Sequence, residues 1–316
     1  MNISRWVAAV FLLGASVAPA QQFPSKPIRL VVPYPPGGVG FVSRILGQKL
    51  GEAWGQNVMI DNRPGGDTII GSEIVARAAP DGYILLMAST AHVINPSLRK
   101  KLPFDPAADF VPITLAAQFP YLVVVHPSVP ARSVQELVAL ARAKPNTLTS
   151  GTGGTLPQLV AGWIYYLAGI KITNVPYKGS SPALIDLIGG NVDLTFTTAV
   201  EPLPFIRSGR LRVLAITSRT RVDFLPGVPT VMESGIPDYD AVGWHGVLAP
   251  AGTPREIISR LNAELTRILR LPETRDRFSR DAIQPAGNSP EEFAGFLKDE
   301  AAKWNKVIQV TGFKVE

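Results

Sequence analysis

The chain carries IRLVVPYPPGGVG at residues 28–40, where a β-branched run meets a glycine-rich turn. The run at 28–32 predicts a strand, and the apolar spacing from Phe41 to Leu50 predicts a helix after the turn. Paired glycines let a backbone approach a ligand closely, and free amides at a helix start bind anions. This segment therefore predicts an open α/β sheet with an anion-binding turn at the carboxyl end of its first strand. A tight turn without a ligand is the alternative.

The same alternation of strand and helix continues along the chain, which is typical of a largely parallel sheet. Further strands are expected at 58–60, 83–87, 123–125, 147–150, 172–175, 192–197 and 211–217, and helices at 69–78, from about 156, at 182–188 and at 201–207. Capping boxes are expected at Ser133–Glu136, Thr253–Glu256 and Ser289–Glu292, and the last of these begins a helix with an apolar stripe.

This alternation of strands and helices occurs in two series, which predicts two α/β lobes. The C-terminal helices have no strand series of their own, so we expect them to fold back on the first lobe. The chain would then cross between the lobes near 117–125 and 240–248. We expect a signal peptide at 1–20, one lobe made of 21–118 plus 247–316, and a second lobe at 119–246. A retained anchor helix is the alternative for the first twenty residues, but their apolar run is short and ends in Ala18-Pro19-Ala20, a typical cleavage signal.

Composition excludes several classes of protein. The net charge of +6 suits an anionic ligand, but Lys and Arg are scattered, so we expect no nucleic-acid partner. With no cysteine and no metal-binding spacing among His92, His126 and His245, we expect no metal and no cofactor. No nucleophile motif is present, so the sequence gives no positive sign of an enzyme.

A second glycine-rich loop, Ser150-Gly151-Thr152-Gly153-Gly154-Thr155, occupies the matching place after a strand in the second half. Two such loops facing each other across a cleft would grip both ends of a small anion. Tyr177 and Lys178 follow another strand, although a surface lysine is usually only solvated. Hydroxyls also end two strands, at 89–90 and 197–198, where capping of the next helix is the alternative role. The expected ligand-binding residues are Tyr34, Gly37, Gly38, Gly40, Phe41, Ser89, Thr90, Ser150, Gly151, Thr152, Gly154, Thr155, Tyr177, Lys178, Thr197 and Thr198.

Six blocks in the family's order resemble the Bug-type substrate-binding proteins of tripartite tricarboxylate transporters. These blocks are PYPPGG at 33–38, DNRPG at 61–65, PDGY at 80–83, NPSL at 95–98, VPYKG at 175–179 and APAGTP at 249–254. The resemblance implies a two-lobed periplasmic binding protein of the Venus flytrap kind, with a carboxylate held by residues 34–41 and 150–155. It also implies membrane transporter subunits as partners.

One position departs from that family's pattern, because Phe41 stands where members commonly have Asp. Phe41 would either pack on an apolar or aromatic ligand or turn into the core between helix and sheet. The sequence thus predicts a monomeric periplasmic receptor for a small carboxylate. The alternatives are a receptor that presents its ligand to a membrane kinase, and an enzyme acting on carboxylates.

Overall fold

The computed structural model describes residues 23–35 and 38–314. The expected signal peptide and Gly37 lie outside these ranges. The described elements are, in chain order, β1 (Ile28–Val32), α1 (Gly38–Trp54), β2 (Val58–Asn62), α2 (Ile69–Ala76), β3 (Ile84–Ser89), α3 (Ala91–Leu98), β4 (Phe110–Val125), α4 (Val134–Ala143), β5 (Thr149–Thr152), α5 (Thr155–Ala168), β6 (Thr173–Pro176), α6 (Ser180–Ile188), β7 (Leu194–Thr198), α7 (Leu203–Arg207), β8 (Arg212–Ile216), β9 (Val242–Pro250), α8 (Arg255–Arg270), α9 (Pro272–Arg280), β10 (Gln284–Pro285) and α10 (Pro290–Thr311).

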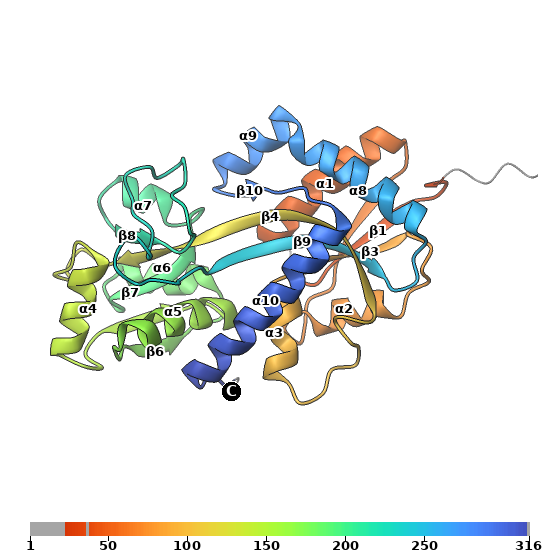
Figure 1. Ribbon diagram of the computed structural model, residues 1–316. Helices are drawn as coiled ribbons and strands as arrows, with labels where there is room; N and C mark the ends of the chain where they lie inside the picture. The colour runs from red at the N-terminus through yellow and green to blue at the C-terminus, as the bar shows by residue number, and fades with distance from the viewer. Residues whose placement is uncertain (1–22, 36–37, 315–316) are drawn as a thin grey trace, which may run out of the picture.

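One long strand, β4, belongs to both lobes (Figure 1). Its first part pairs with β9 as far as Pro120↔Val242, and its last part pairs with β7 from Tyr121↔Thr198 onward. The first lobe is thus the sheet β2-β1-β3-β9-β4 with β10 at its edge, and the second lobe is β4-β7-β5-β6 with β8. The neighbours β4 and β9 run side by side from one lobe to the other.

The predicted parallel strands agree with the structure, whereas β4 and β9 are longer than the sequence suggested. Only residues 123–125 were expected as a strand in the β4 region, and 240–248 were expected as a crossing. Pro112 and Pro120 interrupt the strand pattern, and the pairing of β4 with β9 shifts register after Pro112 and again after Leu115. The stretch 242–246, assigned to the second lobe from the sequence, pairs here with β3 and β4.

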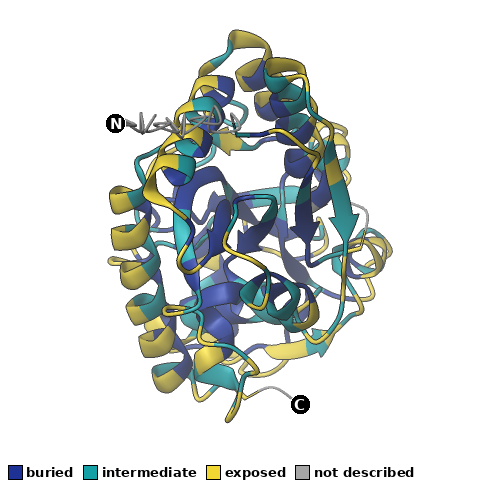
Figure 2. Cartoon of the chain, turned by 90° about the vertical axis from the view of Figure 1, so that its right-hand side faces the viewer, coloured by how far each residue is buried: buried dark blue, intermediate teal, exposed yellow. Residues whose placement is uncertain are grey.

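Helices cover the sheets on both faces, and the buried strands lie between them (Figure 2). On one face of the first lobe, Leu46 of α1 and Leu261 of α8 pack with Ile28, Leu30 and Val32 in one buried cluster. A second cluster extends from the first lobe into the second and includes the apolar stripe of α10, and a third lies within the second lobe. The alternation of inward side chains along β1 therefore supplies both layers of the core.

The C-terminal helix α10 contacts both lobes, since it packs on α3 and on α5. Its indole at Trp304 lies edge-on to Trp163 of α5, with ring centroids 6.2 Å apart. The expectation that the C-terminal helices return to the first lobe alone is therefore incomplete. No described helix is both long enough and apolar enough to cross a bilayer.

The three expected capping boxes differ in the structure. Ser289 and Glu292 form a complete box at the start of α10. Ser133 caps α4, but the carboxylate of Glu136 accepts from the amide of Arg132 instead of from Ser133. The box expected at Thr253 is wrong, because the Thr253 hydroxyl donates to the carbonyl of Pro250 at 2.7 Å and α8 begins without a side-chain cap.

Candidate functional site

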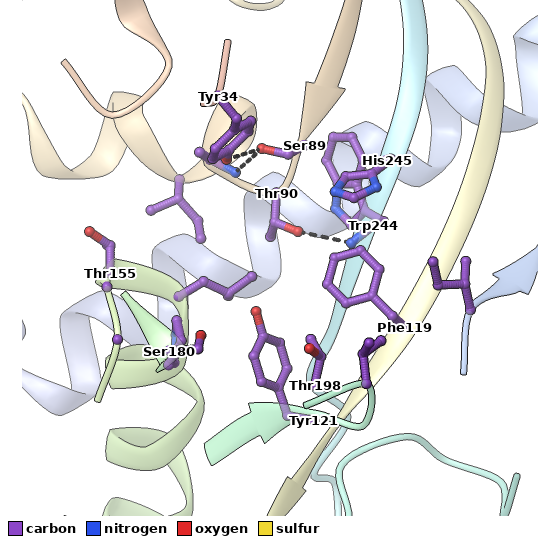
Figure 3. A pocket seen from close by; sticks show the side chains of 18 of the residues that line it. Tyr34, Ser89, Thr90, Phe119, Tyr121, Thr155, Ser180, Thr198, Trp244 and His245 are labelled. Atoms are coloured by element: carbon purple, nitrogen blue, oxygen red, sulfur yellow. Dashed lines mark hydrogen bonds between the residues drawn. The ribbon is translucent and has the colours of Figure 1, made fainter. Parts of the chain in front are cut away.

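A cavity of about 350 Å³ lies between the lobes, at the carboxyl ends of strands from both sheets (Figure 3). The described residues that line it are Tyr34, Asp67, Ser89, Thr90, Ala91, Ile94, Phe119, Tyr121, Gly153, Gly154, Thr155, Leu156, Pro157, Ser180, Thr198, Val200, Trp244, His245, Asp281, Ala282 and Ile283. This is the position at which open α/β sheets usually bind ligands.

Hydroxyl groups form the first-lobe wall. The Tyr34 and Ser89 hydroxyls are 2.7 Å apart, and the Thr90 hydroxyl accepts from the amide of Trp244 at 3.2 Å. Burial raises the pKa of Tyr34 to about 12, with the Ser89 hydrogen bond lowering it slightly. The phenol is therefore neutral at physiological pH and available as a donor.

Two helix starts converge at the second-lobe wall. Gly154 and Gly179 precede α5 and α6 with φ angles of 118° and 112°, a region that favours glycine. Gly153 lies so close to the backbone of the second turn that a Cβ there would come within 2.4 Å of the Gly179 carbonyl carbon. The first amides of each helix have no intrahelical acceptor, so this wall presents donors suited to a carboxylate.

Aromatic rings form the third wall. Phe119 lies between Tyr121 and His245, with ring centroids 6.3 and 4.8 Å away. Trp244 is fully buried, and its indole nitrogen donates to Glu300 on α10. This wall offers an apolar, aromatic surface for the carbon skeleton of a ligand.

The charged side chains among the described lining residues are Asp67 and Asp281, and neither Lys nor Arg is among them. Asp67 links the lobes, because the Thr155 hydroxyl donates to its carboxylate at 3.4 Å. An anion held here would depend on hydroxyls and backbone amides for stabilisation, without an ion pair. No cluster of three possible metal ligands occurs in the described residues.

Six of the expected site residues line the cavity: Tyr34, Ser89, Thr90, Gly154, Thr155 and Thr198. Of the first glycine-rich turn, Gly38 and Gly40 lie within α1 and are not among the described lining residues, and Gly37 lies outside the part of the chain that the structure describes. Phe41 packs on Phe278 of α9, at 6.1 Å between ring centroids, and the Arg277 guanidinium lies over the Phe41 ring at 5.2 Å from its centroid. Its ring therefore lies in the helix contact between α1 and α9, away from the described cavity lining.

The remaining expected residues surround the second glycine loop without lining the cavity. Ser150, Thr152 and Thr197 are buried, and the Thr152 hydroxyl donates to Asn174 at 2.7 Å. Gly151 packs beneath the Tyr177 ring.

The Tyr177 hydroxyl donates to Asp186 at 2.6 Å, which raises the pKa of Tyr177 to about 12, and Lys178 is exposed. These two side chains therefore have partners or solvent other than the cavity.

Sequence reasoning missed the aromatic wall and Ser180. Ser180 had a usable signal, because Gly179-Ser180 before α6 repeats the Gly154-Thr155 arrangement before α5. The sequence contains no comparable signal for Tyr121 and His245, since both lie in strands without a recognisable motif. Their place in one wall depends on the pairing of β4 with β9.

Comparison with known proteins identifies the family. A model described as "Tripartite tricarboxylate transporter family receptor" matches residues 42–313. A UPF0065 protein in the tcbD-tcbE intergenic region of Pseudomonas sp. (strain P51) is 39% identical, across 90% of this chain and 86% of that protein. Protein BugT of Bordetella pertussis is 33% identical across 100% of both chains.

Solved structures agree with this result. Rpa4515 of R. palustris, solved with adipate, is 34% identical with a TM-score of 0.82 across 92% of this chain and 98% of that one. MatC of Rhodopseudomonas palustris, solved with bound malate, is 28% identical with a TM-score of 0.77 across 90% and 100%. The predicted two-lobed binding-protein fold is thereby confirmed. This chain belongs to the receptor family of the tripartite tricarboxylate transporters, which includes the Bug proteins.

Proposed function

We propose that this protein captures a small carboxylate in the periplasm and delivers it to the membrane subunits of a tripartite tricarboxylate-type transporter. The main support is the cavity between the lobes, where the amide-bearing starts of α5 and α6 face the hydroxyls of Tyr34 and Ser89. Relatives solved with adipate and with malate are consistent with a carboxylate ligand.

Binding would couple to closure because the ligand contacts both lobes. A ligand bound equally by open and closed forms shifts no equilibrium, whereas one that bridges two walls favours the closed form. The Thr155–Asp67 contact across the cavity would be retained in such a closed arrangement.

A screen of aliphatic, hydroxylated and aromatic carboxylates by thermal shift and isothermal titration calorimetry tests the proposal. An acid at 100 times its Kd adds about 2.7 kcal/mol to the free energy of unfolding. We expect at least one acid to do so, with one molecule bound per chain. If no carboxylate in the panel binds, the proposal fails.

Two variants at one position test the amide wall. Thr155→Pro removes both the hydroxyl and the amide hydrogen at the first position of α5, where proline suits a helix. Thr155→Val removes only the hydroxyl and is the matched control. Since a hydrogen bond to a charged group contributes about 1.5–3 kcal/mol, Thr155→Pro should weaken binding roughly 10- to 100-fold beyond Thr155→Val.

Export and delivery have separate tests. The mature protein, isolated from the periplasm as a monomer, should begin at Gln21 by N-terminal sequencing. Uptake of the bound acid should require both this receptor and the membrane subunits. Conversion of the acid to product by the purified protein would indicate an enzyme instead, and ligand-dependent phosphorylation without uptake would indicate a sensory receptor.

A further inference from the structure

Two polar side chains in the cavity wall are buried and have no hydrogen-bond partner among the described residues. Tyr121 is only 6% exposed, and its hydroxyl points into the space between the labelled side chains of Figure 3. His245 is 5% exposed and lines the same cavity, and its Nδ1 atom has no partner. The Tyr121 hydroxyl is therefore open to a ligand that enters the cavity, whereas the enclosed Nδ1 of His245 leaves only Nε2 of that ring for such a ligand.

Both groups are uncharged at physiological pH. Burial raises the pKa of the Tyr121 phenol above its usual range, and the nearby Tyr34 adds to the effect. Burial also lowers the pKa of His245 to about 3. A phenol and a neutral imidazole each donate and accept one hydrogen bond, which suits a hydroxyl or carbonyl oxygen.

A second carboxylate would be poorly stabilised beside these groups. The described lining has no Lys or Arg, and its charged members Asp67 and Asp281 repel anions. One carboxylate is accommodated by the amides at the starts of α5 and α6, but a second buried charge without a cation costs several kcal/mol.

The aromatic wall favours a ligand that carries a ring, because tilted aromatic rings pack well against the edge or face of another ring. Tyr121, Phe119 and His245 place three rings in a row, and Ile283 and Trp244 extend the apolar surface. A ligand ring packed on Phe119 would lie beside both polar groups, because Tyr121 and His245 are ring neighbours of Phe119.

We propose that the cavity selects an aromatic monocarboxylate with one uncharged oxygen substituent, which Tyr121 and His245 recognise. This inference rests on the proposed carboxylate-receptor function, and it makes these two residues determinants of specificity.

Isothermal titration calorimetry with four probes tests the selection: benzoate, 4-hydroxybenzoate, terephthalate and adipate. The 4-hydroxybenzoate probe should bind about 10-fold more tightly than benzoate, since one satisfied hydrogen bond corresponds to roughly that factor. Terephthalate and adipate should bind more weakly than 4-hydroxybenzoate, because each carries a second negative charge.

Two variants assign the preference to the side chains named. Tyr121→Phe and His245→Phe should each reduce the advantage of 4-hydroxybenzoate over benzoate, measured as the ratio of the two Kd values. Tyr83→Phe is the control, because the Tyr83 hydroxyl bonds to Ser25, outside the cavity lining. That variant should keep the full preference.

The outcomes separate the two proposals. If a dicarboxylate binds most tightly, or if Tyr121→Phe and His245→Phe weaken all acids equally, the inference about specificity is overturned while the carboxylate receptor stands. If none of the four probes and no other acid of the wider panel binds, the receptor function itself is refuted.

Discussion

Gly153 is the residue on which the second-lobe wall depends. A methyl group there would lie 2.4 Å from both the Gly179 carbonyl carbon and the Ser180 amide nitrogen, and neither backbone atom can move without shifting α6. Gly153→Ala should therefore separate the starts of α5 and α6. We expect a loss of about 1–3 kcal/mol in the free energy of unfolding, typical of overpacking, and at least a 10-fold loss of carboxylate affinity by calorimetry.

Gly162 provides the matched control within α5. A Cβ there meets no atom closer than 3.9 Å, so Gly162→Ala should stabilise the helix by about 0.5–1 kcal/mol and leave affinity unchanged. Equal affinity in Gly153→Ala and Gly162→Ala would show that the approach of the two helix starts is irrelevant to binding.

His245 also affects stability through its charge state. Its pKa in the folded protein is about 3, because burial disfavours the charged ring, whereas an unfolded histidine titrates near 6.5. The unfolded state therefore binds the proton first as the pH falls below 6.5, and stability decreases with it. Between pH 7 and pH 5 this residue should cost about 2 kcal/mol of the free energy of unfolding.

Urea titrations at both pH values measure that cost. In His245→Phe, the decrease in stability from pH 7 to pH 5 should be about 2 kcal/mol smaller than in the unchanged protein. His92 is buried as well, with a pKa lowered to about 4, so part of the decrease should remain. An unchanged decrease in His245→Phe would mean that this imidazole is protonated in the folded state.

At the scale of elements, the sequence predicts the parallel strands well and the strands β4 and β9 poorly. The bounds of β1 agree because Ile28–Val32 is an apolar run broken only by Arg29 and bounded by Pro27 and Pro33, and β–turn–helix units are local in sequence. The strands β4 and β9 depend on pairing between residues more than a hundred positions apart, such as Pro120 and Val242. Local patterns carry no such information, so the aromatic wall that these strands present was also missed.

The contact between α10 and β9 depends on a buried carboxylate. Glu300 accepts from the indole nitrogens of Trp244 at 3.1 Å and of Trp304 at 2.9 Å, and it pairs with Lys303. Glu300→Gln would place an amide donor among these donors and leave Lys303 without its partner. We expect a loss of about 2–3 kcal/mol in urea unfolding, together with a shift in tryptophan fluorescence.

Glu291→Gln, on the same helix, is the control for that change. Glu291 is exposed, and its carboxylate lies 3.7 Å from the guanidinium of Arg255. Its loss should alter stability by less than about 0.5 kcal/mol. If both variants behave alike, the carboxylate between the two indoles does not hold α10 to the sheet.

At the scale of the whole molecule, the two strands that cross between the lobes determine how the lobes can move relative to each other. The strands β4 and β9 cross as neighbours, so the lobes can rotate about this pair, while α10 contacts both lobes and limits how far they separate. The glycine turns were predicted to face each other across a cleft. Pro36 and Gly37 of the first turn lie outside the described residues, so that prediction stays open; the described cavity lining sets the second-lobe turn against the hydroxyls of Tyr34, Ser89 and Thr90.

Small-angle scattering tests whether ligand binding closes the lobes. With a saturating amount of the tightest acid of the panel, the radius of gyration should decrease, because the acid contacts both walls and stabilises the form in which Thr155 reaches Asp67. Benzamide has the size of benzoate but no negative charge for the starts of α5 and α6 to bind, so it should leave the radius unchanged. A shift from about 1% closed to about 99% closed requires about 5.5 kcal/mol of preference for the closed form. An unchanged radius with a tightly bound acid would mean that the lobes are already closed without a ligand, and that recognition by the transporter depends on something other than closure.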